Sequence, residues 1–353
     1  RDAASFQAKV RSLLDGVRRT VETGLPTLVA FPEDVGTPCF LCGTGVVRPE
    51  EEDSVPLDRV IARLARKHLP KVLMTRIRHR VGWVRALMLV RARETARVYF
   101  DVFRGAARDY GYYIAAGSAC LPEWVIPSPD PCRVGSGHQG SYRQESSLRS
   151  PDPAAVYNIA FLFGPDGRLA GWQKKVNLLD LEGPGGLDLS PGTLEELRVI
   201  DTSAGRLGTA VCLDAFELPV RRRLLELGAR ILVQPSANPK AWTAEQQEDW
   251  LRGAHNAVRG ELSSPDRSSA PAGSRGSTAE AGKGWDGSNG EGTLTAGTGV
   301  LDRFAYAVNP MMVGSLFGLG FEGQSAVIWD DGWAVAGDPL GEEIVTAMLP
   351  FPR

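Results

Sequence analysis

Cys212 is the cysteine best placed for chemistry, because it ends the strand-like run LGTAVC and is followed by a turn at LDAFE. A thiolate is a strong nucleophile, but the thiol needs a base to take its proton or a cation to stabilise the anion. A backbone N–H that follows the turn is placed to face an oxyanion formed at the sulfur. A buried, inert thiol is the alternative interpretation of the same position.

Candidate partners for Cys212 follow other predicted strands. Glu33 comes after the apolar run LVAFP, and a carboxylate at the rim of a partly apolar cleft can have the raised pKa of a general base. Lys175 ends RLAGWQKKV, where strand alternation points only one of the two adjacent lysines inward, and Glu182 lies in the following loop. Each residue alone is also consistent with an exposed, solvated charge. Together they form a Glu, Lys, Glu, Cys set at strand ends.

The histidines are weaker partners for the thiol. Two lie in a basic segment, one in a loop rich in Gly and Ser, and one in a polar helix, so none follows a predicted strand: His68, His79, His138 and His255. A Cys–His pair therefore stays open as an alternative, but these positions do not support it.

Alternating helices and strands would position the candidate residues. The apolar periodicity predicts an amphipathic helix over 2–22, and strand-forming runs follow at short intervals. The predicted strands are 26–31, 111–118, 156–164, 168–176, 206–214, 230–236, 305–310 and a hairpin over 324–337; the other predicted helices lie near 95–109, 219–229 and 240–258. We therefore expect an α/β protein.

Two segments depart from this alternation. Residues 58–97 contain twelve Lys and Arg against two Asp and Glu, a net charge of +10, interleaved with apolar residues. This pattern predicts either a basic amphipathic helix pair that contacts a membrane surface, an acidic partner or a nucleic acid, or an inserted arm with solvated charges. Residues 260–299 are rich in Gly, Ser, Ala and Thr, which is typical of a surface loop.

Composition narrows the class of protein. The chain has 353 residues with 43% hydrophobic residues and a net charge of −2, so no global field recruits nucleic acid. Five cysteines in a chain of this length favour a reducing compartment such as the cytoplasm over a disulfide framework. Cys39 and Cys42 form a lone C-x-x-C without a second pair, so no metal site is predicted, and the glycine-rich runs lack the context of a phosphate-binding loop.

The order of these motifs resembles the nitrilase (carbon–nitrogen hydrolase) superfamily. The matching runs are LVAFPE with Glu33, QKKVNL with Lys175 and LGTAVCLDAFELP with Cys212, followed by GARILVQPSANP, VNPMMVG and FEGQSAVIWDDG. The resemblance extends over most of residues 5–345. Asn177 stands where the family often has His, and His255-Asn256 replaces the usual Glu-Asn pair.

The resemblance implies an α-β-β-α sandwich of two packed sheets with outer helices, and a homodimer or larger homo-oligomer. Residues 1–353 would form one carbon–nitrogen hydrolase domain, with a basic helical insertion at about 56–95 and a Gly/Ser-rich loop insertion at about 260–299. Family members begin with a strand before the first helix, which suggests that the chain starts late. The family's chemistry requires no metal or cofactor.

The resemblance also assigns roles to the site residues. Glu33 would take the proton of Cys212 and pass it to the departing amine, while the Lys175 cation and the Leu213 N–H stabilise the tetrahedral intermediate. An acyl-thioester would form on Cys212, and water activated by Glu33 would release the acid, with Glu182 positioning substrate or water. Asp214 would tie the turn after the nucleophile or take a catalytic part.

A small amide is the expected substrate. True nitrilases usually carry Trp-Glu after the nucleophile, where this chain has Leu213-Asp214, so a nitrile is the weaker expectation. N-carbamoyl hydrolysis and acyl transfer to another acceptor stay open. An alternative of another class is a catalytically silent scaffold that docks on an acidic surface through Arg76, Arg78 and Arg80.

Overall fold

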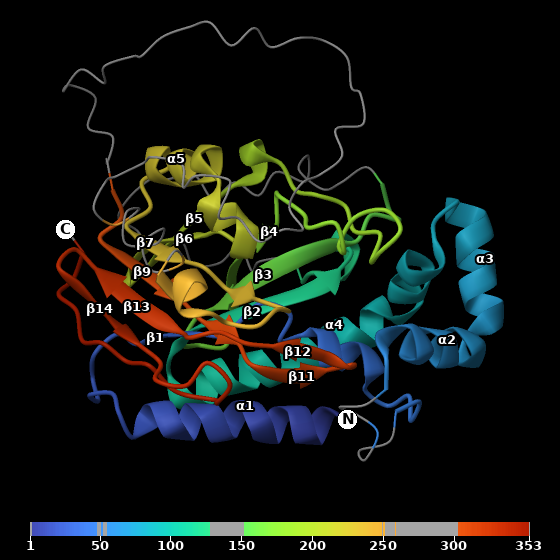
Figure 1. The fold of residues 1–353 in the computed structure, drawn as a ribbon, viewed down its shortest axis with the longest axis horizontal. Helices are drawn as coiled ribbons and strands as arrows, with labels where there is room; N and C mark the ends of the chain where they lie inside the picture. The colour runs from blue at the N-terminus through green and yellow to red at the C-terminus, as the bar shows by residue number, and fades with distance from the viewer. Residues whose placement is uncertain are drawn as a thin grey trace, which may run out of the picture.

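Two β-sheets stack face to face with helices on both outer sides, as Figure 1 shows. The computed structural model describes residues 2–47, 51, 55–127, 152–248, 250, 258 and 303–352. The expected α-β-β-α sandwich is confirmed by this arrangement. Among the described residues, no helix combines the length and apolar character needed to span a bilayer.

The first sheet has four strands in the order β1-β2-β3-β4, and only the β1–β2 pair is parallel. Its strands are β1 (Leu28–Ala30), β2 (Tyr113–Leu121), β3 (Tyr157–Phe163) and β4 (Leu169–Lys174). Two helices, α1 (Ala3–Arg18) and α4 (Trp83–Tyr110), cover its outer face through an apolar core that includes Phe103 and Phe161.

The second sheet has six strands in the order β14-β13-β9-β7-β6-β5, with parallel pairs at β9–β7 and β7–β6. Its strands are β5 (Val199–Thr202), β6 (Gly205–Thr209), β7 (Ile231–Val233), β9 (Tyr306–Asn309), β13 (Ala326–Trp329) and β14 (Gly332–Val335). Helix α5 (Leu218–Glu226) packs on its outer face. Two small sheets pair β8 (Ser236–Ala237) with β10 (Met311–Met312) and β11 (Gly314–Leu316) with β12 (Leu319–Phe321).

Apolar side chains fill the space between the two large sheets. Ala115 and Leu162 of the first sheet meet Leu207, Ile231 and Val233 of the second. Because successive side chains point to opposite faces of a strand, the neighbours of these residues pack under the helices instead. The strands of the first sheet are thus covered on both faces, which explains their nearly continuous apolar sequence.

Helix α1 forms where the periodicity predicts it. Phe6, Val10 and Leu14 recur at three- and four-residue spacing and are buried in the core of the first sheet. Asp2 caps its start, because its side chain accepts the N–H of Ser5 at 2.7 Å and the Ser5 hydroxyl accepts the N–H of Asp2 at 3.2 Å. The helix ends at Arg18, earlier than the predicted limit of 22.

The basic segment forms three helices in place of a pair. These are α2 (Leu57–Lys67), α3 (Leu69–His79) and the first half of α4, so the helix predicted near 95–109 is the second half of a 28-residue helix. Val60, Leu64 and Val72 bury against the β11–β12 hairpin, while the Lys and Arg side chains are mostly exposed. The apolar residues of this segment therefore anchor α2 and α3 on the body of the protein.

Several local predictions need correction. The strand predicted over 206–214 ends at Thr209, and Cys212 instead begins a short 3₁₀ helix, Cys212–Phe216. Strand β5 was not predicted, and Cys120 lies in β2. The predicted loop over 260–299 and residues 249 and 251–257 of the helix predicted near 240–258 lie outside the described residues, as do Cys132, His138 and His255.

A bulge in β2 shapes the backbone that carries Glu33. The pairing of β2 with β3 shifts register between Ala115 and Ser118, and Gly117 within the bulge has a φ of +63°. A Cβ at Gly117 would lie 1.9 Å from the carbonyl oxygen of Pro32. The Ser118 hydroxyl also accepts the N–H of Asp34 at 3.0 Å. The chain on both sides of Glu33 is therefore held against β2.

We predict that Gly117→Ala lowers the free energy of unfolding by about 3 kcal/mol or more, because the new methyl group would displace the backbone of Pro32. Urea denaturation measures this change. The matched control is Gly24→Ala, whose φ is +88° but whose added Cβ meets no atom within 4 Å, and it is expected to cost about 1 kcal/mol. Equal losses in the two variants would show that the close approach to Pro32 is unimportant.

Candidate active site

A buried ammonium group between two carboxylates forms the centre of the site. The Nζ atom of Lys175 lies 2.8 Å from Oε1 of Glu33 and 2.7 Å from Oε2 of Glu182. Their side chains are 1%, 3% and 9% exposed. Glu33 lies three residues after β1, Lys175 directly follows β4, and Glu182 lies in the loop beyond it. Three of the four residues grouped at strand ends from the sequence are thus in direct contact.

Asn158 is a partner that the sequence analysis missed. From the start of β3, its Nδ2 group donates to Oε1 of Glu33 and to Oε1 of Glu182, both at 2.9 Å. The N–H of Leu179 completes the shell by donating to Oε2 of Glu182 at 2.9 Å. A signal was present, because Asn158 is a polar residue inside the apolar run VYNIAFLFG. Such a buried amide needs hydrogen-bond partners.

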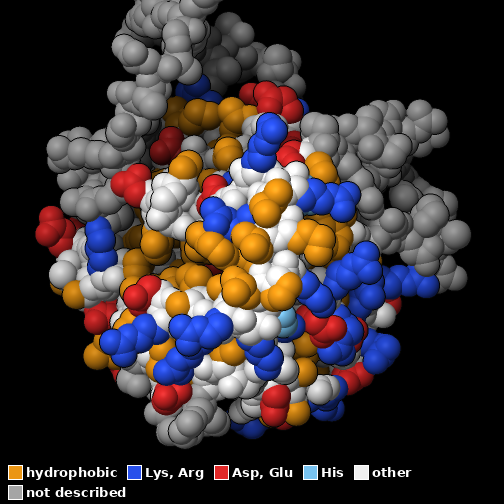
Figure 2. Space-filling view, turned by 90° about the vertical axis from the view of Figure 1, so that its right-hand side faces the viewer, with side chains coloured by type: hydrophobic (Ala, Val, Ile, Leu, Met, Phe, Trp, Pro, Cys, Tyr) orange, Lys and Arg blue, Asp and Glu red, His pale blue; other side chains and the backbone are white. Residues whose placement is uncertain are grey.

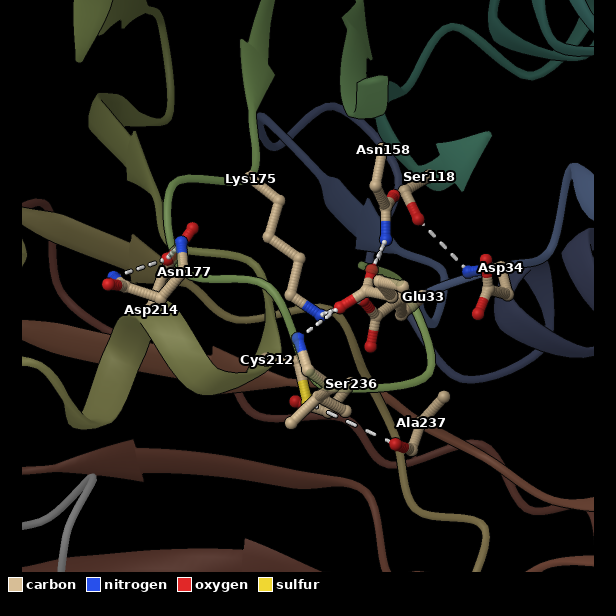
Figure 3. Close-up of polar contacts among 12 residues, drawn as sticks. Glu33, Asp34, Ser118, Asn158, Lys175, Asn177, Cys212, Asp214, Ser236 and Ala237 are labelled. Carbon is tan, nitrogen blue, oxygen red and sulfur yellow. Dashed lines mark hydrogen bonds and ion pairs between the residues drawn. The ribbon is translucent and has the colours of Figure 1, made fainter. Parts of the chain in front are cut away.

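The backbone at Cys212 turns sharply and presents the sulfur to the same centre (Figure 3). Cys212 has a φ of +50°, an uncommon conformation for a residue with a side chain. Its N–H donates to the carbonyl of Pro235 at 2.9 Å, and its sulfur lies 3.9 Å from the carbonyl oxygen of Ala237. The N–H of Leu213 lies in the first turn of the 3₁₀ helix, where amides lack acceptors within the helix.

Asp214 connects the nucleophile turn to the chain beyond Lys175. It is fully buried, and its carboxylate accepts the N–H of Val176 at 2.9 Å, the N–H of Asn177 at 2.7 Å and the Asn177 side-chain amide at 2.8 Å. Burial raises its pKa to about 6, while these hydrogen bonds act in the opposite direction. The geometry is that of a brace between two site segments.

The two adjacent lysines lie on opposite sides of their strand, as alternation predicts, but both are buried. Lys175 reaches the site, whereas Lys174 lies against the carboxylates of Glu123 and Glu196 and over the ring of Tyr157. The expectation that only one lysine points inward is therefore wrong. The two side chains bury in separate ion-pair clusters, one on each side of the strand.

Burial and charge set the protonation of the central pair. Burial raises the pKa of the Glu33 carboxyl; the Lys175 cation lowers it, the Glu182 carboxylate raises it again, and the net direction is upward. For the Lys175 ammonium, burial lowers the pKa, but the negative charges of Glu33, Cys212 and Glu182 outweigh this effect and raise it well above its ordinary value. Lys175 therefore stays charged while Glu33 becomes a stronger base.

The thiol of Cys212 is held in its neutral form. Burial raises its pKa, the nearby Glu33 carboxylate raises it further, and the Lys175 cation only partly offsets both. A free thiolate is therefore disfavoured in this environment. Nucleophilic attack requires that the proton leave as the new bond forms, and Glu33 is the adjacent carboxylate able to accept it.

Aromatic side chains lie beside the nucleophile. Trp250 packs against the small buried cluster of Ala160, Val211 and Cys212. Its ring is 4.8 Å from that of Phe216, centroid to centroid, in an edge-on arrangement. This side of the site is therefore apolar, in contrast to the charged side formed by Lys175 and the carboxylates.

Other candidate residues lie elsewhere. Cys39 and Cys42 are buried near the start of the chain, with Cys42 against the carbonyl of Pro38, and His68 and His79 lie at the two ends of α3. Across the described ranges, no three His, Cys, Asp or Glu side chains are grouped as ligands for a metal ion.

The sequence of this chain is similar to those of known carbon–nitrogen hydrolases. The family model described as "Carbon-nitrogen hydrolase" matches residues 81–258, which include Lys175, Glu182 and Cys212. Human omega-amidase NIT2 is 30% identical over 132 residues, covering 34% of this chain and 46% of that protein. Omega-amidase NIT2 of Xenopus tropicalis is 29% identical over 166 residues, covering 43% and 58%. The chain spans about half the length of the curated relatives it matches.

Solved structures extend the likeness to nearly the whole chain. Nit3 of Saccharomyces cerevisiae, a member of branch 10 of the nitrilase superfamily, superposes with a TM-score of 0.52 at 15% identity, covering 98% of this chain and 83% of Nit3. A carbon–nitrogen hydrolase from Helicobacter pylori G27 gives 0.51 at 16% identity with the same coverage. At this identity the likeness establishes the fold. Because the family match spans half of the sequence, the chain belongs to the carbon–nitrogen hydrolase family.

Proposed function

We propose that this protein hydrolyses the C–N bond of a small amide, not a peptide bond, through an acyl-thioester on Cys212. The observation that carries the proposal is the buried Lys175 ammonium, shared by Glu33 and Glu182 beside the thiol. A cation fixed in a buried site stabilises an oxyanion more strongly than it would in water. Membership of the carbon–nitrogen hydrolase family supports the same reaction class.

In the proposed first half-reaction, the Cys212 sulfur attacks the amide carbonyl carbon as its proton passes to Glu33. The transfer moves one negative charge from the carboxylate toward the substrate oxygen, so the net charge of the buried site does not change. The Lys175 ammonium and the Leu213 N–H stabilise the oxyanion. Glu33 then donates the proton to the amine nitrogen, the C–N bond breaks, and the acyl group remains on sulfur.

In the proposed second half-reaction, Glu33 takes a proton from water, which attacks the thioester carbonyl and releases the carboxylic acid. The departing Cys212 thiolate takes that proton from Glu33, and the cycle closes. Glu182 and Asn158 act as positioning residues, because each contacts the Lys175–Glu33 pair without contacting the sulfur through a hydrogen bond in the described structure. The apolar wall around Trp250 would contact the acyl part of the substrate.

The proposed acyl-thioester should be detectable as an increase in the mass of the protein. Intact-mass spectrometry with a panel of small amides should detect one acyl adduct on the wild-type protein and none on Cys212→Ala. Lys175→Ala should lower kcat/KM by about 10²–10³-fold, because it removes an oxyanion stabiliser. The matched control is Cys120→Ala, which removes another thiol near the same carboxylates and should keep the adduct. Full turnover in Cys212→Ala or Lys175→Ala would refute the mechanism.

The pH dependence of kcat/KM should show the effect of the Glu182 carboxylate on the pKa of Glu33. The proposed base acts as the ionised carboxylate, so kcat/KM should rise with pH through the pKa of Glu33, above the ordinary glutamate value of about 4.3. Glu182→Gln removes the negative charge that raises this pKa, so the acid limb should move to lower pH even as kcat falls. Glu196→Gln, which alters the separate Lys174 cluster, should leave the limb in place. An unmoved limb in Glu182→Gln would contradict the assignment.

Asp214 should act as a brace and not in proton transfer. Asp214→Asn places an amide donor against one of the backbone N–H groups, so the free energy of unfolding should fall by about 1–3 kcal/mol and kcat should fall with it. Asn177→Ala, which removes only the side-chain bond to Asp214, should have a smaller effect. Denaturation and the pH profile of kcat/KM separate the two roles. A shifted acid limb at unchanged stability would assign Asp214 to proton transfer.

A further inference from the structure

Helix α3 presents its apolar residues to solvent. Leu69, Leu73 and Ile77 recur every fourth residue and are 45%, 45% and 72% exposed, and Met74 beside them is 65% exposed. Only Val72 of this helix is buried. Trp83, at the start of α4, is 43% exposed. We call these five exposed residues the α3 face; a soluble monomer rarely exposes such a group without a binding partner.

Positive charge borders the α3 face. On a helical projection, Lys71 and Arg78 lie along one margin of the apolar stripe, and Arg80 follows at the end of the helix. Within the described ranges, no carboxylate lies within ion-pair distance of these three side chains, whereas Arg63 and Arg85 pair with Glu51 and Asp188. Figure 2, seen from the side of α3, shows apolar side chains gathered together with Lys and Arg around them.

The α3 face is fixed to the body of the protein. The guanidinium of Arg76 lies 4.0 Å from the centre of the Trp83 ring. At the α3–α4 junction, the N–H of Gly82 donates to Asp188, and Arg85 forms an ion pair with Asp188 at 3.1 Å. Asp188 belongs to the loop that carries Glu182. The apolar stripe therefore has a defined orientation relative to the site and is not the side of a loose helix.

We propose that the α3 face binds the surface of an anionic phospholipid bilayer. A helix with an apolar stripe and basic margins lies in the interfacial plane, with its apolar residues at the boundary of headgroups and acyl chains. Lys and Arg side chains at its edges then contact anionic headgroups, each contributing to binding by charge attraction. The α3 face has both the apolar stripe and the basic margin on one rigid surface. Basic side chains alone would be enough to bind an acidic protein or a nucleic acid, so the apolar stripe favours a bilayer.

Vesicle co-sedimentation of the whole protein tests the proposal. The protein should pellet with vesicles of phosphatidylcholine containing about one third phosphatidylglycerol, and much less with vesicles of phosphatidylcholine alone. Raising NaCl from about 0.1 M to about 1 M shortens the Debye length from about 10 Å to about 3 Å and should release most of the bound protein. Equal binding to neutral vesicles, or no binding to either, would overturn the proposal.

Two double variants separate the apolar and charged contributions. Met74→Ser with Ile77→Ser, and Lys71→Glu with Arg78→Glu, should each weaken partitioning by about tenfold or more. All four side chains are exposed, so folding should be preserved, and circular dichroism verifies this. The control, Leu340→Ser with Met348→Ser, removes equally exposed apolar residues of the C-terminal segment, at 63% and 65%, and should bind as the wild type does.

Further measurements distinguish other occupants of the α3 face. If size-exclusion chromatography shows that Met74→Ser with Ile77→Ser splits an oligomer while vesicles are not bound, the face is an interface between copies of the chain and the proposal is wrong. Cys212→Ala should bind vesicles as the wild type does, because it leaves the α3 face untouched. Failure of amide hydrolysis and failure of membrane binding are therefore separate results.

Discussion

The structure depends on one buried interaction, the Lys175 ammonium held between the carboxylates of Glu33 and Glu182. Removing three charges from water is unfavourable, and their mutual attraction offsets this only when the geometry is good and the remaining hydrogen bonds are made. Asn158 donates to both carboxylates and so completes the set. Burial raises the pKa of the Glu33 carboxyl, and the Glu182 carboxylate raises it further, because two carboxylates share one cation and one negative charge is left over.

The fold supplies the rigidity that this arrangement requires. Glu33 is held by the bulge of β2 at Gly117, and the chain beyond Lys175 is held by Asp214, which belongs to the turn of Cys212. The first sheet thus positions base and cation, and the second sheet, through the turn after β6, positions the nucleophile. Neither sheet alone contains the site. Apolar packing between the sheets holds these two parts of the site together.

Charge is distributed unequally between the site and the surface. The site keeps its charges buried and in contact with one another, whereas α2 and α3 carry most of theirs into solvent, next to apolar residues that are also exposed. Near the end of α3, at the start of α4, Arg85 forms an ion pair with Asp188, which lies in the loop of Glu182.

Residue type, order and local periodicity were sufficient to predict the alternation of helices and strands and the grouping of Glu33, Lys175, Glu182 and Cys212, because strand-forming runs and the residues that follow them are local features of a chain. The sandwich was predicted only through the resemblance of these motifs to the nitrilase superfamily. Only the tertiary structure revealed Asn158, whose contact with Glu33 joins residues 125 positions apart. It also decided that α3 leaves its apolar stripe uncovered. An amphipathic helix has the same sequence pattern whether its apolar side is buried or exposed, so the outcome depends on which elements pack against it, and that is a property of the whole fold.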